Sequence, residues 1–320
     1  MTSVLHFHDP AGVASHLSRE QQDRGIKSDV VVTHDPFDYG YDYKLSRVSE
    51  GSSLPEKFLL MFDQFYELVK IAKNYDILHF HVSSSLDYQK PFYPRGIDDP
   101  IYQLLGVRVI LHYHGSNVRH TGDPLLHQVF ADRRLVSTPD LLRWVKNAKW
   151  IPNPIDIGNI PHPGVDQNGP PYTVCHAPTN REIKGTDEVI DTIESLRKSG
   201  YNIELDLVES VSREEALQRL ASADIIVDQL NLGWYGMVSI EALSLGKPTC
   251  VYIDSEVVPK DFNSPLVNVN QSNLYDKLQL LIENPEYRQE LGKRGRRFVE
   301  NTHHPKVVAQ QVEDVYQQVL

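Results

Sequence analysis

Short apolar runs alternate with amphipathic segments along nearly the whole chain. The runs have the length and composition of buried parallel strands, and turn residues follow most of them. The segments between them repeat apolar residues at helical spacing, most clearly at 56–73. This alternation predicts an α/β protein with parallel sheets covered by helices. The expected strands are 3–8, 28–33, 76–81, 107–114, 135–138, 148–151, 172–176, 202–208, 224–228 and 249–253.

The pattern divides into two halves with the same plan. A chain of 320 residues is long for one core and suits two domains of ordinary size. A Pro- and Gly-rich connection at 152–171 marks the boundary, and Pro305 separates a terminal amphipathic helix from the helix before it. We therefore predict an N-terminal domain at 1–155, a C-terminal domain at 156–304 and a terminal helix at 305–320.

Composition narrows the class of protein. The formal net charge of −11 argues against a general nucleic-acid-binding surface. Cys175 and Cys250 lie in apolar runs and are expected to be buried core residues rather than a disulfide or metal ligands. With no run of about 18 apolar residues, we expect a cytoplasmic protein. The basic residues at 288–297 favour a solvated helix face, with peripheral contact with the inner face of a membrane as the alternative.

The stretch 224–250 carries the most chemistry. An apolar strand ends at Asp228, and Gly233 and Gly236 flank a turn that leads into a helix from Met237. The N–H groups at the start of that helix can bind an anion such as a diphosphate. Glu241, about one turn into the helix, can accept hydrogen bonds from a ribose diol. The alternative is a tight turn with a solvated glutamate that favours the helix dipole.

Two cations precede another helix of the second half. Arg181 and Lys184 lie in an expected loop at 177–186, ahead of a helix that starts near Asp187. Cations and free N–H groups in this position can neutralise a diphosphate leaving group. The alternative is a solvated pair of charges near Glu182.

Histidines mark strand ends in the first half. The runs 76–81 and 107–114 end in His81 and His114, at the sheet edge where doubly wound proteins bind ligands. Each could instead be a hydrogen-bonded structural group, as could His6 and His8. Gly12 follows the first strand, as in a phosphate-binding Rossmann unit, although one glycine is a weak indication. The Tyr- and Asp-rich segment 34–54 is expected to be a surface loop without a metal motif.

Several segments resemble those of retaining glycosyltransferases of family four. They are Gly236-Met237-Val238, Glu241-Ala242, Gly246-Lys247-Pro248, the Arg181 to Gly185 segment, and the runs DILHFH and VILHYHGSNVR. The resemblance covers nearly the whole chain. One departure stands out, because Gly233 occupies the position of the first glutamate in the family's pattern.

The resemblance implies two Rossmann-like domains whose parallel sheets face a central cleft, the GT-B architecture, with the terminal helix crossing back onto the first domain. It implies transfer of a sugar from a nucleotide-diphosphate donor to a saccharide, lipid or protein acceptor, with retention of anomeric configuration. Neither a metal nor a cofactor is expected. Because Gly233 replaces the family's first glutamate, two alternative functions remain. One is an inactive scaffold or nucleotide-binding protein of this fold, and the other is a sugar-nucleotide epimerase.

The resemblance also assigns roles to residues. His114 would be the catalytic histidine beside the donor sugar, and Gly115 would let the backbone approach it. Ser116, Asn117 and Arg119 would line the pocket at most. Glu241 would bind the ribose. The remaining donor-binding residues would be Gly12, Arg181, Lys184, Gly236, Met237 and Val238.

Overall fold

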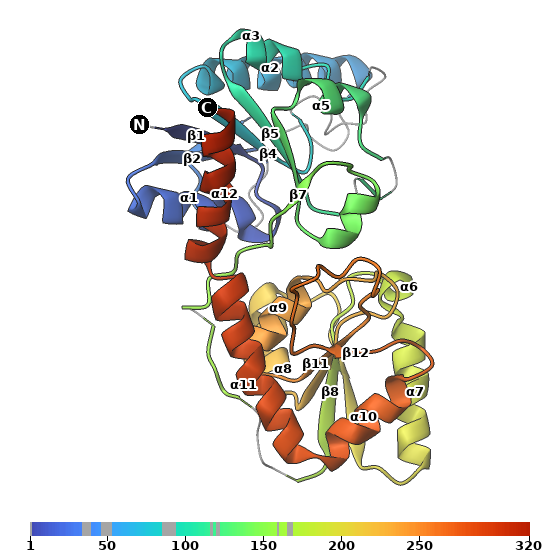
Figure 1. Ribbon diagram of the computed structural model, residues 1–320. Coiled ribbons are helices and arrows are strands. Elements are labelled where there is room, and N and C mark those ends of the chain that lie inside the picture. The colour runs from blue at the N-terminus through green and yellow to red at the C-terminus, as the bar shows by residue number, and fades with distance from the viewer. Residues whose placement is uncertain are drawn as a thin grey trace. The chain divides into compact units, whose positions relative to one another are not determined.

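The computed structural model divides into two compact units (Figure 1). Unit 1 comprises Met1–Pro154 and Pro305–Leu320, and unit 2 comprises Ile155–His304. The terminal segment thus belongs to unit 1 although all of unit 2 precedes it in the chain. The residues that the structure describes are 2–33, 40–45, 53–84, 94–115, 118–119, 122–158, 160–164 and 169–320.

Unit 1 contains a parallel sheet of seven strands in the order β3-β2-β1-β4-β5-β6-β7. The order of strands along the sheet reverses between β1 and β4, and doubly wound sheets bind ligands at the carboxyl ends beside such a switch. The strands are β1 Ser3–Phe7, β2 Lys27–Val32, β3 Tyr43–Lys44, β4 Ile77–His81, β5 Arg108–Tyr113, β6 Arg133–Val136 and β7 Lys149–Trp150.

Successive residues of these strands face opposite sides of the sheet, and each side has its own helical cover. On one side, Val4 and Ile77 pack with α1 (Val13–Asp23) and α12 (Pro305–Val319). On the other, Leu5 and Phe80 pack with α2 (Leu54–Ala72) and α3 (Asp99–Leu104), and α5 (Leu125–Phe130) packs against α3. Figure 1 shows α12 beside α1.

Unit 2 contains a parallel sheet of five strands in the order β12-β11-β10-β8-β9, which reverses between β8 and β10. Helices α7 and α10 contribute to the core on one face, while α9 packs against α8 and α11. The strands are β8 Tyr172–His176, β9 Ile203–Leu207, β10 Ile225–Val227, β11 Thr249–Val251 and β12 Val267–Asn268. The helices are α6 Arg181–Lys184, α7 Thr186–Lys198, α8 Arg213–Ser222, α9 Met237–Ser244, α10 Leu274–Glu283 and α11 Pro285–Thr302.

Three local expectations were wrong. The expected loop at 177–186 contains the single helical turn α6, whose N-cap Asn180 accepts a hydrogen bond from the Ile183 amide. The helix expected from Pro139 is a 3-10 helix, Pro139–Arg143. Part of the segment 34–54 forms the edge strand β3 and the start of α2, while 34–39 and 46–52 lie outside the described residues.

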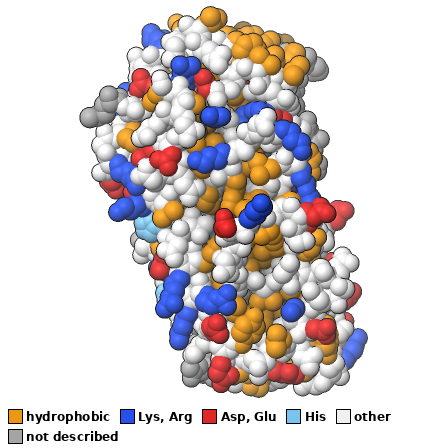
Figure 2. Space-filling model, in the orientation of Figure 1, with side chains coloured by type: hydrophobic (Ala, Val, Ile, Leu, Met, Phe, Trp, Pro, Cys, Tyr) orange, Lys and Arg blue, Asp and Glu red, His pale blue; other side chains and the backbone are white. Residues whose placement is uncertain are grey.

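Large apolar side chains remain exposed on α2, α3 and α5 (Figure 2). Leu59, Leu104 and Leu125, one on each helix, are 67%, 87% and 71% exposed. An exposed apolar surface of this kind is typical of a contact site. Among the helices that the structure describes, none has the length and apolar character needed to span a membrane.

Candidate functional site

A buried ion pair lies at the switch point of the unit 2 sheet. Lys184, the last residue of α6, places Nζ 2.5 Å from Oδ1 of Asp228, which directly follows β10. The Asp228 side chain is fully buried and that of Lys184 is 10% exposed. The fold therefore brings the predicted Lys184 to the carboxyl end of the central strands, where a carboxylate already holds it.

Asp228 accepts two further hydrogen bonds. The Gly236 amide lies 3.2 Å and the Ser239 hydroxyl 2.7 Å from Oδ2. Burial opposes ionisation of this carboxyl, but Lys184 and these two donors outweigh it and hold the pKa of Asp228 below its usual value. Asp228 thus fixes the Lys184 ammonium and the first turn of α9 in one arrangement.

The N-terminus of α9 lies beside that ammonium. Gly236 is the N-cap in an extended conformation and has no side chain of its own with which to cap the helix. A Cβ atom at Gly236 would lie 4.0 Å from Lys184 Nζ. An anion placed there would meet the cation together with the N–H groups of Met237 and Val238. Four of the predicted donor-binding residues therefore lie on one side of unit 2.

Arg181 points to a different carboxylate. Its Nε lies 2.8 Å from Glu209 Oε1 and its Nη2 2.5 Å from Glu209 Oε2. The guanidinium lowers the pKa of Glu209 through this hydrogen bond. The Arg181 side chain is 53% exposed, so the pair lies in solvent and is weak. Arg181 is therefore a solvated partner of Glu209, not of Glu182, and can exchange that partner at low cost.

Glu241 lies in a second ion pair at α9. Its Oε1 is 2.9 Å from Nη2 of Arg213, the first residue of α8. Burial raises the pKa of Glu241, and Arg213 opposes that shift. Arg213 could not be recognised from the sequence, because only the tertiary packing of α8 against α9 brings the two residues together.

The turn at Gly233 does not suit a glutamate. Gly233 has a φ of +75°, and a Cβ atom built there would lie 3.1 Å from the Cβ of Asp254. The Asp254 amide also donates to the Gly233 carbonyl at 2.9 Å. A side chain at position 233 would thus require both a strained backbone and a shift of the segment at 254.

The N-terminus of α1 differs from that of α9. Gly12 is its N-cap, with a φ of +79°. The Asp9 carboxylate accepts from the Ala14 amide at 2.7 Å and from the Ser15 hydroxyl at 2.6 Å. The chain's own carboxylate thus occupies the position at Gly12 where the sequence pattern places a phosphate.

His114 follows β5 and is half-buried. Its Nε2 lies 3.1 Å from Nδ1 of His81. Burial lowers the pKa of His114 to about 4, although the Asn153 side chain opposes the shift, so the imidazole is neutral at pH 7. At Gly115 φ is +127°, and a Cβ atom there would meet the Arg119 guanidinium at 2.9 Å. Arg119 itself binds Asp140 at 2.7 Å, while Ser116 and Asn117 lie outside the described residues.

His114 belongs to a group of imidazoles that the sequence analysis treated one at a time. The motif Leu-His-aromatic-His occurs at 5–8, 78–81 and 111–114, on β1, β4 and β5. Strand pairing aligns His6 with His79 and His81 with His112. The repeated motif was therefore a signal that could have predicted the group. We call it the imidazole ladder, and its members are His6, His79, His81, His112 and His114.

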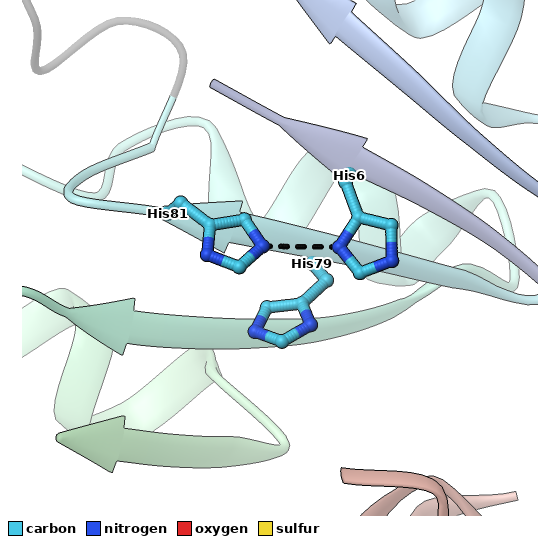
Figure 3. A group of neighbouring side chains, drawn as sticks. All are labelled: His6, His79 and His81. Carbon is cyan, nitrogen blue, oxygen red and sulfur yellow. Dashed lines mark hydrogen bonds between the residues drawn. The ribbon is translucent and has the colours of Figure 1, made fainter. Parts of the chain in front are cut away.

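The imidazole ladder lies on the sheet face that α1 and α12 cover. His6 contacts Gln21 of α1, and His79 Nδ1 lies 2.7 Å from the Tyr316 hydroxyl of α12. Figure 3 shows His6 and His81 joined by a hydrogen bond, with the His79 ring beside them. Burial lowers the pKa of His6 to about 4 and those of His79, His81 and His112 well below the usual value. The ladder is therefore neutral at pH 7.

Comparison with known proteins identifies the architecture. No family model matches the sequence, and no curated protein matches it either. The structure resembles HepE from Anabaena in complex with UDP-glucose (14% identity, TM-score 0.67, covering 99% of this chain and 100% of that one). It also resembles a glycosyltransferase from Rickettsia africae, with 10% identity, a TM-score of 0.71, and coverage of 99% of this chain and 98% of that one. A third similar structure is sucrose-phosphate synthase from Thermosynechococcus elongatus, with 15% identity, a TM-score of 0.67, and coverage of 100% of this chain and 99% of that one. The chain therefore has the α/β GT-B fold, with two Rossmann-like domains, as predicted.

We expect the substitution Asp228→Asn to destabilise unit 2 by about 3 kcal/mol, because it leaves the buried Lys184 cation without its counter-ion. Urea unfolding followed by hydrogen exchange would measure the loss. Asp206→Asn is the matched control, since it removes the partner of Arg219 in a partly exposed pair and should cost less than about 1 kcal/mol. Equal losses in the two variants would contradict the prediction.

Unit 1 should lose stability in mild acid. The unfolded chain takes up protons at its histidines near pH 6.5, whereas His6, His79, His81 and His112 stay neutral in the folded state to lower pH. The stability is therefore complete above about pH 6.5 and falls below it, by roughly 1.4 kcal/mol per pH unit and histidine. Hydrogen exchange in urea at about pH 7.5 and about pH 5.5 should show a loss of roughly 5 kcal/mol in unit 1. A stability independent of pH over this range would refute the neutral ladder.

Proposed function

We propose that the protein is a glycosyltransferase that moves a sugar from a nucleotide-diphosphate donor to an acceptor, with retention of anomeric configuration and without a metal ion. The proposal rests on one observation. The Lys184 ammonium lies beside the N-terminus of α9, whose N-cap is a glycine, at the switch point of the unit 2 sheet. This arrangement fits the leaving group of such a reaction, which is an anion bearing two phosphates.

Each part of the donor has a proposed partner. Lys184 and the amides that follow Gly236 would bind the diphosphate, and Arg181 would join them by leaving Glu209. Cations and helix dipoles can stabilise departure of a diphosphate without a metal ion. Glu241 would accept hydrogen bonds from the ribose, with Arg213 opposing the rise in the pKa of Glu241 that burial causes.

His114 is the proposed catalytic residue. A neutral imidazole can stabilise positive charge on the reacting sugar through its position and dipole, and the departing phosphate can take the acceptor's proton. Burial, which lowers the pKa of His114 to about 4, suits this role better than that of a cationic acid.

The compared structures suggest which donor to test first. HepE was solved with UDP-glucose, and an α-glucosyltransferase with a similar fold was solved with UDP-glucose and DNA containing an abasic site. UDP-sugars are therefore the first candidates, and saccharides, lipids and proteins remain the classes of acceptor. The Gly233 turn leaves the choice of sugar open, because the family's first glutamate is absent there.

Calorimetry with UDP and other nucleoside diphosphates, followed by product analysis, tests the proposal. Binding of UDP together with acceptor-dependent transfer would support it, and product NMR would report the anomeric configuration. Conversion of the donor alone would indicate an epimerase, and binding without turnover a scaffold or nucleotide-binding protein. Activity lost in EDTA and restored by a divalent cation would refute metal independence.

The double variant Lys184→Met, Asp228→Asn removes the proposed diphosphate cation without leaving a buried charge unpaired. We expect UDP affinity to fall roughly 10- to 100-fold, because a charge-assisted contact is lost. Lys198→Met is the matched control, since it removes a surface lysine at the far end of α7. Calorimetry should show an unchanged Kd for the control. Unchanged affinity in the double variant would exclude Lys184 from the diphosphate site.

Glu241→Gln and His114→Asn should separate binding from turnover. Glu241→Gln should weaken UDP binding roughly tenfold, because an amide is a poorer acceptor for a ribose diol. His114→Asn should leave the Kd for UDP unchanged and lower kcat roughly 100-fold or more. Steady-state kinetics with a confirmed donor would measure both effects. If both variants kept full activity, these two assignments would be wrong.

A further inference from the structure

Four side chains form a continuous hydrogen-bonded chain that ends at His114. Oε1 of Gln21 lies 3.0 Å from Nε2 of His6, and Nδ1 of His6 lies 3.0 Å from Nε2 of His81. Nδ1 of His81 lies 3.1 Å from Nε2 of His114. Gln21, His6 and His81 are fully buried. Each imidazole in the middle of the chain therefore uses both of its nitrogens.

The polarity of this chain follows from its buried end. In the amide orientation that the structure assigns to Gln21, its Oε1 accepts from the Ser28 hydroxyl at 2.7 Å, and a carbonyl oxygen can only accept from His6 as well. His6 must then carry its proton on Nε2, which leaves its Nδ1 to accept from His81. A neutral imidazole has one donor and one acceptor, so His81 in turn accepts from His114.

We propose that Gln21, His6 and His81 fix His114 as the tautomer protonated at Nε2, so that its Nδ1 accepts a hydrogen bond from a hydroxyl of the donor sugar. Gln21, His6 and His81 are positioning residues, because they act through His114. This inference rests on the proposed function in naming the sugar, whereas the tautomer itself does not depend on it.

The exposed end of the chain cannot set this polarity. The Asn153 side chain also hydrogen-bonds His114, but an amide can either donate or accept. The three buried groups have no such freedom once Gln21 has accepted from both His6 and Ser28. The His114 ring is thus oriented before a ligand binds, as second-shell partners orient ligating histidines.

The ring geometry favours hydrogen bonds over a metal site. His6, His79 and His81 offer nitrogens within 4.8 Å of one another, as do His81, His112 and His114. The lone pair of an imidazole lies in its ring plane, so the ligands of one ion must aim their planes at a common point. The rings of His79 and His81 instead stack, with centroids 4.3 Å apart and planes 22° apart. The in-plane lone pairs of two stacked rings lie in nearly parallel planes, which does not aim them at one point.

Nitrogen NMR of the protein labelled with ¹⁵N-histidine tests the tautomer directly. The spectra distinguish protonated from bare ring nitrogens, and single histidine variants assign the signals. We expect His114 to be protonated at Nε2 and bare at Nδ1 at pH 7. Protonation at Nδ1 instead would overturn the proposal, whether or not the protein is active.

Three variants test the route of the effect. His81→Phe keeps a ring but breaks the chain, so His114 should populate both tautomers and kcat should fall roughly 10- to 100-fold. His81→Gln offers one donor and one acceptor and should restore the single tautomer and most of the activity. His112→Phe is the matched control, because His112 contacts His114 by its ring face, with centroids 4.3 Å apart. It should leave the tautomer unchanged.

The remaining outcomes are also decisive. If His81→Phe and His112→Phe had equal effects on the His114 tautomer, the proposal that the hydrogen-bonded chain sets the tautomer would be wrong. If adding Zn²⁺ to EDTA-treated protein shifted the NMR signals of the ladder nitrogens stoichiometrically, these histidines would form a metal site rather than a hydrogen-bonded chain. If the tautomer is as expected but no nucleotide sugar is bound or consumed, the proposed function fails, and the hydroxyl assignment fails with it, while the hydrogen-bonded chain stands.

Discussion

A carboxylate buried at the end of a parallel sheet needs a cation beside it, and Asp228 meets this requirement through Lys184. The same carboxylate also binds the Gly236 amide and the Ser239 hydroxyl. One buried group thereby sets the position of a cation and of a helix N-terminus. Folding has already desolvated the ion pair, so under the proposed function an anion would find its partners already in place. Binding would add a second anion to Lys184 rather than recruit a mobile side chain.

Unit 1 places uncharged polar side chains, rather than an ion pair, at the switch point of its sheet. The strands β1 and β4 flank the switch point of its sheet, and β5 lies next to β4. Where unit 2 places an ion pair, unit 1 places imidazoles that are neutral because burial lowers their pKa. The acid at its first helix, Asp9, is used to cap α1. The two parallel sheets thus carry different local chemistry at their switch points, a buried ion pair in unit 2 and neutral imidazoles in unit 1.

The α/β class and the two-domain plan could be predicted from the sequence because apolar runs and helical spacing report burial directly, whereas the GT-B architecture was implied by the resemblance of several segments to a known family. The helix α9 was anticipated from Met237 onward because Gly236 precedes it and Gly246 follows it. By contrast, α6 has only four residues, too few to show a period. The partners Glu209 and Arg213 depend on how separate elements pack, which local sequence does not encode. Lys184 and Gly236, which were predicted to belong to one site, lie close together, whereas the occupation of the α1 N-terminus by Asp9 was missed.

The assignment of α12 to unit 1 bears on how the chain is made. Val308, Val312 and Tyr316 fill the same apolar cluster as Val4 and Ile77, so this face of the unit 1 sheet has no complete cover until the final helix has been synthesised. Unit 2 is continuous in sequence and needs no later segment. N-terminal domains usually mature first on the ribosome, but unit 1 cannot complete this cluster until after all of unit 2 has been synthesised. Until then, one apolar face of the nascent unit 1 sheet would be incompletely covered, and chaperones could bind this exposed face.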